Sequence, residues 1–160
     1  MMTATGDNTD RTEMRPLVLS LKPRFASAIL NGDKTVELRR QRVAAPPQTQ
    51  LILYASAPVM AVVGVALLLD SETDTAQLIW RRHRRKLGLT RAEFDTYLCG
   101  SPTATALTLG FPTELPDPPS LAMLRAESGF HPPQSYRYLH SGDHQILHSA
   151  ADHLMKRLVS

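Results

Sequence analysis

The sequence contains a single cysteine, Cys99, among its 160 residues. One thiol cannot form a disulfide within the chain, and chains without disulfides are typical of a reducing compartment. A structural zinc site built on several cysteines is excluded for the same reason. The cysteine content therefore predicts a cytoplasmic protein.

Long hydrophobic runs are also missing. The longest, Val59–Leu69, is far shorter than the stretch of about 20 residues that a transmembrane helix needs. The polar start of the chain, residues 1–15, contains no hydrophobic stretch of the kind found in secretory signals. We therefore expect no membrane helix, no signal peptide and no membrane partner.

Glycine-rich nucleotide motifs are a further absence. The sequence has neither a Walker motif nor the glycine fingerprint of dinucleotide-binding folds. This disfavours nucleotide-driven and redox chemistry, and we expect no cofactor.

The hydrophobic residues, 42% of the chain, are sufficient for the core of one domain. Their periodicity, with the turn residues between them, predicts a mixed α+β fold. Gly64 interrupts a β-rich run and indicates a bulge or bend, and the prolines within 112–119 predict an extended connection. Thr90 and Glu93 form a helix-capping pattern. The predicted strands cover residues 17–21, 34–40, 51–56, 59–69 and 103–109, and the predicted helices cover 24–31, 75–86, 90–98 and 141–158.

The last predicted helix is amphipathic, and we expect it to pack on the domain that precedes it. Contact with another subunit is the alternative, and the sequence leaves the oligomeric state open. His144, His148 and Asp152 recur every four residues along one side, a spacing that a metal site can use. They border the polar face, where solvated side chains are expected, so we predict no metal site. The apolar stripe consists of Ile146, Leu147, Ala150, Leu154 and Leu158.

Positive charge is concentrated in two stretches, although 18 basic and 15 acidic residues give a net charge of only +3. Residues 15–42 contain seven basic residues and two acidic ones, and residues 81–91 contain six basic residues and no acidic one. Such clusters are typical of proteins with a polyanionic partner, although solvated helix or strand faces also produce them. The second cluster comprises Arg81, Arg82, Arg84, Arg85, Lys86 and Arg91.

The stretch 32–39 combines two cations and a carboxylate on a predicted half-buried strand. Glu37 and Arg39 share one strand face, and Lys34 at the strand entrance needs a twist to join them. Glu37 beside two cations would stay ionised and accept hydrogen bonds from a base amino group, while the cations would hold phosphate. The alternative is a solvated ion pair at a strand edge. Because exposed ion pairs contribute about 0–1 kcal/mol, loss of Lys34 or Arg39 is expected to leave the fold intact.

This stretch resembles the GxKxxExR signature of the ASCH family, which Gly32, Lys34, Glu37 and Arg39 match without gaps. Residues 19–23, 51–56 and 132–136 are also similar to ASCH segments, so the resemblance extends over 17–139. It implies an α+β fold with a PUA-like mixed β-barrel of about five to six strands and flanking helices. We therefore expect an ASCH domain over 17–140 and, outside the resemblance, a flexible tail over 1–16, which lacks apolar periodicity, and an extra C-terminal amphipathic helix over 141–160.

For function, the resemblance implies a cleft that binds RNA or a modified nucleobase or nucleoside, in a binding or regulatory role. Some ASCH relatives are enzymes, which leaves a hydrolase as the alternative: a ribonuclease or an N4-acylcytidine amidohydrolase. Lys34 lies at the position of the amidohydrolase lysine, but Glu37 replaces its catalytic threonine, and residues 80–86 offer no catalytic acid. In an enzyme, Lys34 would be nucleophile or base and Glu37 would orient it.

The residues expected to contact the ligand come from both basic stretches and from the ASCH-like segments. The tyrosines among them are candidates for stacking on a base, with core packing as the alternative. The full set is Lys22, Lys34, Glu37, Arg39, Arg40, Tyr54, Ser56, Arg81, Arg82, Arg84, Arg85, Gln134, Ser135 and Tyr136.

Overall fold

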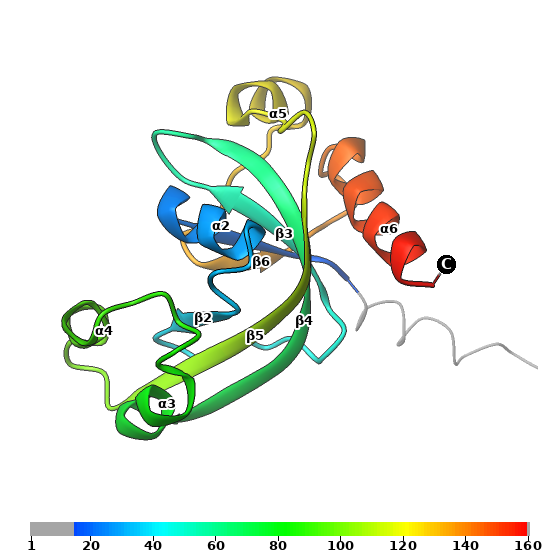
Figure 1. The fold of residues 1–160 in the computed structure, drawn as a ribbon. Helices are drawn as coiled ribbons and strands as arrows, with labels where there is room; N and C mark the ends of the chain where they lie inside the picture. The colour runs from blue at the N-terminus through cyan, green and yellow to red at the C-terminus, as the bar shows by residue number, and fades with distance from the viewer. Residues whose placement is uncertain (1–14, 160) are drawn as a thin grey trace, which may run out of the picture.

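The structure is a computed structural model that describes residues 15–159 (Figure 1). The predicted flexible tail, residues 1–16, lies outside the described residues except for its last two. The described residues form six strands and five helices. In chain order these are β1 (Leu17–Leu21), α2 (Pro23–Leu30), β2 (Val36–Arg39), β3 (Gln50–Ala55), β4 (Ala61–Thr75), α3 (Ala76–His83), α4 (Arg91–Tyr97), β5 (Thr103–Glu114), α5 (Leu121–Ser128), β6 (Tyr136–Tyr138) and α6 (Gln145–Val159).

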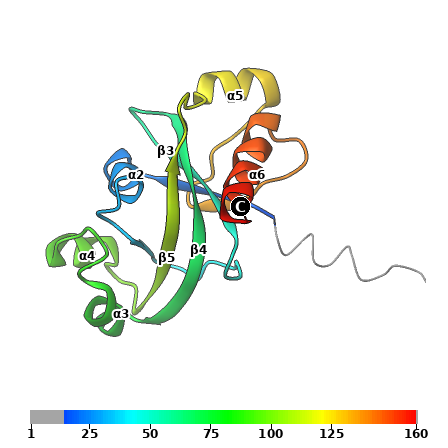
Figure 2. The same cartoon turned by 45° about the vertical axis from the view of Figure 1, so that its right-hand side comes forward.

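All six strands belong to one curled sheet with the order β2-β5-β4-β3-β1-β6. β1 pairs with β3 in parallel, and the other neighbours are antiparallel. The long strands β4 and β5 bend along their length, with α2 on the inner side of the curl and α6 on the outer side (Figures 1 and 2). The predicted mixed α+β fold with about five to six strands is confirmed.

The central strands are buried on both faces, as their continuous hydrophobic runs predict. In β3, Leu51 and Leu53 face the inner core with α2, while Ile52 faces the outer core with α5 and α6. A third core joins β2 and β5 to α3 and α4, where Phe94 packs against Val36 and its neighbours. Because successive side chains of a strand point to opposite faces of the sheet, β3 contributes residues to two cores.

The bulge predicted around Gly64 is present. Leu53 pairs with Gly64 and Tyr54 pairs with Val62, so Val63 is the extra residue on β4. A Cβ atom on Gly64 would lie 2.7 Å from the carbonyl oxygen of Thr113. Glycine therefore permits the close approach of β5 at the point where the sheet bends.

Four features differ from the sequence predictions. Strand β6 was not predicted. β4 continues to Thr75 instead of ending at Leu69, because its second half pairs with β5. Pro112 lies within β5 rather than in the extended connection. Helix α5 was not predicted, although Ser120 caps its start and Gly129 ends it in a left-handed conformation.

Helix α6 uses a different stripe from the predicted one. Leu147, Ala151 and Leu154 are buried, whereas Ile146 and Leu158 are exposed. Neither α6 nor any other helix within residues 15–159 combines the length and hydrophobicity that spanning a membrane requires. The cytoplasmic location and the division of the chain after residue 140 stay predictions.

The close approach at Gly64 can be tested with Gly64→Ala. The added methyl group meets the Thr113 backbone, so we expect a loss of about 1–3 kcal/mol in the free energy of unfolding. Gly110→Ala in β5 is the matched control, because the three atoms nearest to its Cβ belong to the flexible side chain of the exposed Leu69. Urea denaturation of both variants measures the difference, and equal stabilities would contradict the packing role of Gly64.

Candidate functional site

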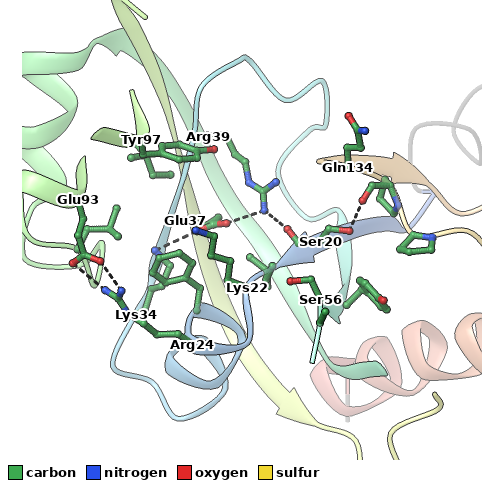
Figure 3. Close-up of a pocket in the computed structure, with 18 of the residues that line it drawn as sticks. Ser20, Lys22, Arg24, Lys34, Glu37, Arg39, Ser56, Glu93, Tyr97 and Gln134 are labelled. Atoms are coloured by element: carbon green, nitrogen blue, oxygen red, sulfur yellow. Dashed lines mark hydrogen bonds and ion pairs between the residues drawn. The ribbon is translucent and has the colours of Figure 1, made fainter. Parts of the chain in front are cut away.

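A cavity of about 870 Å³ opens beside the inner face of the sheet. Its walls come from α2, β2, α4, the turn after β3 and the segment before β6 (Figure 3). This volume lies in the range of about 300–1,000 Å³ that is usual for small-molecule pockets. Segments far apart in the sequence therefore meet around one pocket.

Three charged side chains, Lys34, Glu37 and Arg39, lie together in this pocket and are here called the charged cluster (Figure 3). Glu37 Oε1 is 3.2 Å from Lys34 Nζ, and Glu37 Oε2 is 2.8 Å from Arg39 Nη2. Only 1% of Lys34 is exposed, and only 6% of Glu37 and of Arg39. The structure therefore overturns the expectation of exposed ion pairs. Replacing a member of the cluster should affect stability.

The burial of the cluster follows from what covers each face of β2. Val36 and Leu38 face the third core, and Glu37 and Arg39 face the pocket. A half-buried strand was predicted, but all four residues of β2 are buried. The alternating sequence pattern predicts burial of one face only and could not show that the face with Glu37 and Arg39 is buried as well.

Lys34 lies just before β2, and its ammonium reaches back to the cluster as the predicted twist requires. Its Nζ donates a hydrogen bond to the carbonyl of Leu87 and lies 4.9 Å from the centre of the Phe25 ring. Burial lowers the pKa of the Lys34 ammonium, and the Glu37 carboxylate opposes part of this shift. Lys34 is therefore easier to deprotonate than an ordinary lysine.

Arg39 links the edge strand β2 to the opposite side of the curled sheet. Its Nη2 donates to the carbonyl of Ser20 at 2.7 Å, and its Nη1 donates to Ser135 Oγ at 3.1 Å. Ser20 Oγ in turn donates to the carbonyl of Pro133 at 2.6 Å. The Nε atom of Arg39 is buried and has no hydrogen-bond partner in the described part of the chain. The guanidinium thus holds the pocket wall together.

The rim of the pocket is fastened by an ion pair between α2 and α4. Arg24 Nη1 is 2.5 Å from Glu93 Oε2, and Arg24 Nη2 donates to the carbonyl of Gly88 at 3.2 Å. The hydrogen bonds from Arg24 and from the Thr90 backbone lower the pKa of Glu93 to about 2. The same carboxylate completes the capping box predicted for Thr90.

Several predicted ligand contacts lie at the pocket. Lys22, Ser56 and Gln134 line it, and so does Tyr54, which is largely buried with its ring 6.3 Å from that of Phe130. Burial raises the pKa of the Tyr54 hydroxyl. Tyr54 therefore combines core packing with a place in the pocket wall.

Other predicted contacts lie elsewhere. Ser135 supports Arg39 from behind the pocket wall, and Tyr136 packs on the inner core and accepts a hydrogen bond from the Ala44 amide at 3.3 Å. Arg40 is exposed and reaches the Cys99 carbonyl at 3.4 Å. The pocket lining in the described residues does not include these three, nor Arg81, Arg82, Arg84 and Arg85.

Sequence reasoning missed other parts of the pocket, notably Arg24, Phe25 and Tyr97. Tyr97 recurs one turn after Glu93 on the helix over 90–98, which was predicted from its cap. That spacing places both residues on one face of α4. Only the tertiary structure shows that this face covers a pocket.

His144, which recurs with His148 and Asp152 at four-residue spacing, directly precedes α6. His144 lies 2.9 Å from Glu127 on α5. Within residues 15–159, no group of three or more histidine, cysteine or acidic side chains is arranged to hold a metal ion.

Comparison with known proteins identifies the family. The chain is 33% identical over 140 residues to an ASCH domain-containing ribonuclease from Zymomonas mobilis, covering 87% of this chain and 94% of that relative. The chain belongs to the ASCH family. The crystal structure of ASCH from Zymomonas mobilis superposes with a TM-score of 0.78 at 33% identity, covering 85% of this chain and 95% of that one. The half-barrel is thus the PUA-like fold of ASCH proteins.

More distant similarities concern the fold alone. A crystal structure of a protein from Pseudomonas putida matches with a TM-score of 0.56 at 12% identity, covering 84% of this ASCH chain and 98% of that one. No protein-family model matches the chain.

The burial of the charged cluster can be tested with Glu37→Gln. The change leaves two buried cations without a counter-charge, and we expect a loss of about 3–5 kcal/mol in the free energy of unfolding. Glu93→Gln is the matched control, since it changes an equivalent carboxylate in an exposed pair at the rim. Denaturant titrations should show a large loss for the first variant and little change for the second. Similar stabilities would mean that the cluster is not electrostatically coupled.

Proposed function

We propose that this ASCH pocket binds one nucleotide of a single-stranded RNA. The observation that carries the proposal is the net positive charge of the charged cluster, in which two buried cations share one carboxylate. An uncompensated buried charge is unfavourable. An anionic or strongly polarised group of a ligand, such as a phosphate or a base carbonyl, would balance it.

The size and rim of the pocket favour a single strand over a duplex. The cavity of about 870 Å³ accommodates a nucleotide but not a helix. Phe25 and Tyr97 add aromatic rings to the lining. Unpaired bases stack on such rings, whereas double-stranded RNA is recognised through the shape of its backbone and minor groove.

The relative from Zymomonas mobilis supports RNA as the polyanion, because that protein is named a ribonuclease. Its similarity extends over nearly the whole of both chains. A free modified nucleoside is the other ligand that the family resemblance suggests, and it can be compared directly with RNA in binding measurements.

Lys22→Ala tests the pocket without disturbing its buried part. Lys22 is exposed at the pocket and has no ion-pair partner among the described residues. Loss of one charge-assisted contact, about 1.5–3 kcal/mol, should weaken binding of a single-stranded RNA by about tenfold or more. The melting temperature should stay unchanged. Fluorescence anisotropy with labelled RNA, alongside thermal melts, measures both quantities.

Lys156→Ala, an exposed lysine on the distant helix α6, is the control for a general effect of charge. Equal weakening by the two variants, or none by Lys22→Ala, would count against the pocket. Tighter binding of free N4-acetylcytidine than of RNA would replace RNA by a nucleoside ligand.

A second candidate function is cleavage of the bound RNA, favoured by the lowered pKa of Lys34 and by the name of the relative. The neutral Lys34 amine would take the proton from a ribose 2′-hydroxyl. The 2′-oxygen then attacks the adjacent phosphorus, the bond to the 5′-oxygen breaks, and the proton passes to that oxygen through water. The products are a 2′,3′-cyclic phosphate and a 5′-hydroxyl. Glu37 would position the amine rather than react.

This mechanism predicts how cleavage depends on pH. Because only the neutral amine acts as base, the rate should rise with pH and level off above the lowered pKa of Lys34, before the ordinary value of 10.5. In Lys34→Arg the side chain stays charged, so the rise should disappear. Gel analysis of product ends across pH measures this.

Wild-type and Lys34→Arg proteins of equal thermal stability and equal cleavage rate would eliminate the role of Lys34. Incubation with N4-acylcytidines in parallel tests the amidohydrolase alternative, which stays a prediction. Release of free cytidine without cleavage of RNA would favour that chemistry.

A further inference from the structure

The segment Arg81–Lys86, here called the basic run, carries positive charge that the described part of the chain does not neutralise. Arg82 is paired with Glu72 at 2.8 Å and with Asp74 at 3.3 Å. The other four basic side chains are exposed, and none has an ion-pair partner among residues 15–159: Arg81, Arg84, Arg85 and Lys86. The basic run therefore presents unpaired cations to solvent.

Stabilisation of helix α3 accounts for the cations at only some positions of the basic run. Cations in the last turn of a helix interact favourably with its dipole, and Arg81 and Arg82 occupy the last turn of α3. Arg84 is the C-cap residue, and Arg85 and Lys86 follow it. The dipole effect falls off beyond the end of the helix, so Arg85 and Lys86 need another explanation.

The basic run continues directly into the wall of the pocket. The Lys86 carbonyl accepts a hydrogen bond from the Thr35 amide at 3.1 Å, and the next carbonyl, that of Leu87, accepts from Lys34. Leu87 is fully buried in the third core, and Leu89 lines the pocket. Backbone hydrogen bonds thus fix the position of the run relative to the charged cluster.

The surroundings of the run favour a nucleic acid over a membrane surface. Peripheral membrane helices combine basic residues with an exposed apolar face. Of the large hydrophobic residues next to the run, Ile79 and Leu87 are buried in the third core, and Trp80 is partly buried against it. Among the described residues, none of the large exposed hydrophobic side chains belongs to 76–90.

We propose that the basic run binds the phosphates of the RNA that flanks the nucleotide in the pocket. This inference rests on the proposed function, because the strand that leaves the pocket is what brings phosphates to Lys86, Arg85 and Arg84. The run contributes affinity without sequence specificity, since phosphates are identical along the strand. Each contact releases counterions and steepens the salt dependence of binding.

The double variant Arg84→Gln/Arg85→Gln tests the inference with two RNAs. A labelled trinucleotide fills the pocket and adds at most one nucleotide on either side of it, whereas a labelled dodecamer is long enough to follow the basic run. Losing two phosphate contacts should weaken dodecamer binding by about tenfold and flatten the slope of log K against log salt by about 1.4, or ~0.7 per contact. Binding of the trinucleotide should not change.

Lys156→Gln/Arg157→Gln is the matched control. It removes the same charge from the end of α6, which lies well apart from α3 in both views (Figures 1 and 2). This variant should bind both RNAs like wild type. Thermal melts establish that both double variants are folded, which is expected because all four side chains are exposed.

Three outcomes would overturn the inference: an unchanged dodecamer slope in Arg84→Gln/Arg85→Gln, an equal change in the control, or an equal loss for the trinucleotide. If Arg84→Gln/Arg85→Gln bound phosphatidylserine vesicles more weakly than wild type but bound RNA equally well, the partner would be a membrane instead. A failure of the proposed function would give a different result. Wild type and Lys22→Ala would bind the dodecamer equally, and neither would bind the trinucleotide. Arg84→Gln/Arg85→Gln would still lower the salt dependence of dodecamer binding.

Discussion

The contact between Arg39 and Glu37 is the interaction on which the arrangement of this ASCH protein depends. A buried guanidinium is stable only with a counter-charge and with acceptors for its N–H groups. Glu37 supplies the charge, and Ser20 and Ser135 supply acceptors from the opposite side of the sheet. One side chain therefore draws the edge strand β2 toward β1 and the segment before β6, and the half-barrel curls around a pocket.

The same interaction gives the pocket its chemistry. Glu37 forms ion pairs with both Arg39 and Lys34, so one carboxylate neutralises only one of two cations. Burial lowers the pKa of the Lys34 ammonium. Apolar residues in place of the charged cluster would avoid the cost of burying charge, and replacing buried ion pairs by apolar residues is often stabilising. The excess positive charge is thus better explained by a ligand than by the fold. The rim pair between Arg24 and Glu93 then holds α4 over this charge.

Much of the fold was predictable because it rests on local patterns. Alternating and continuous hydrophobic runs located the strands, Gly64 marked the bulge, and Thr90 with Glu93 marked the start of α4. The signature from Gly32 to Arg39 located the charged cluster. Local patterns failed where a second element covers a segment: β2 is buried on both faces, and the buried stripe of α6 includes Ala151 in place of Ile146.

The sequence by itself determined five of the six strands, most helices, the family and the identity of the charged residues, because these depend on neighbouring residues and short motifs. Only the tertiary structure decided what those residues face. Phe25 and Tyr97 lie 72 positions apart, yet both line one pocket, and the carbonyl that binds Lys34 belongs to Leu87, 53 positions away. Burial, and with it the pKa of Lys34 and the net charge of the pocket, depends on such long-range packing. No local pattern encodes that packing.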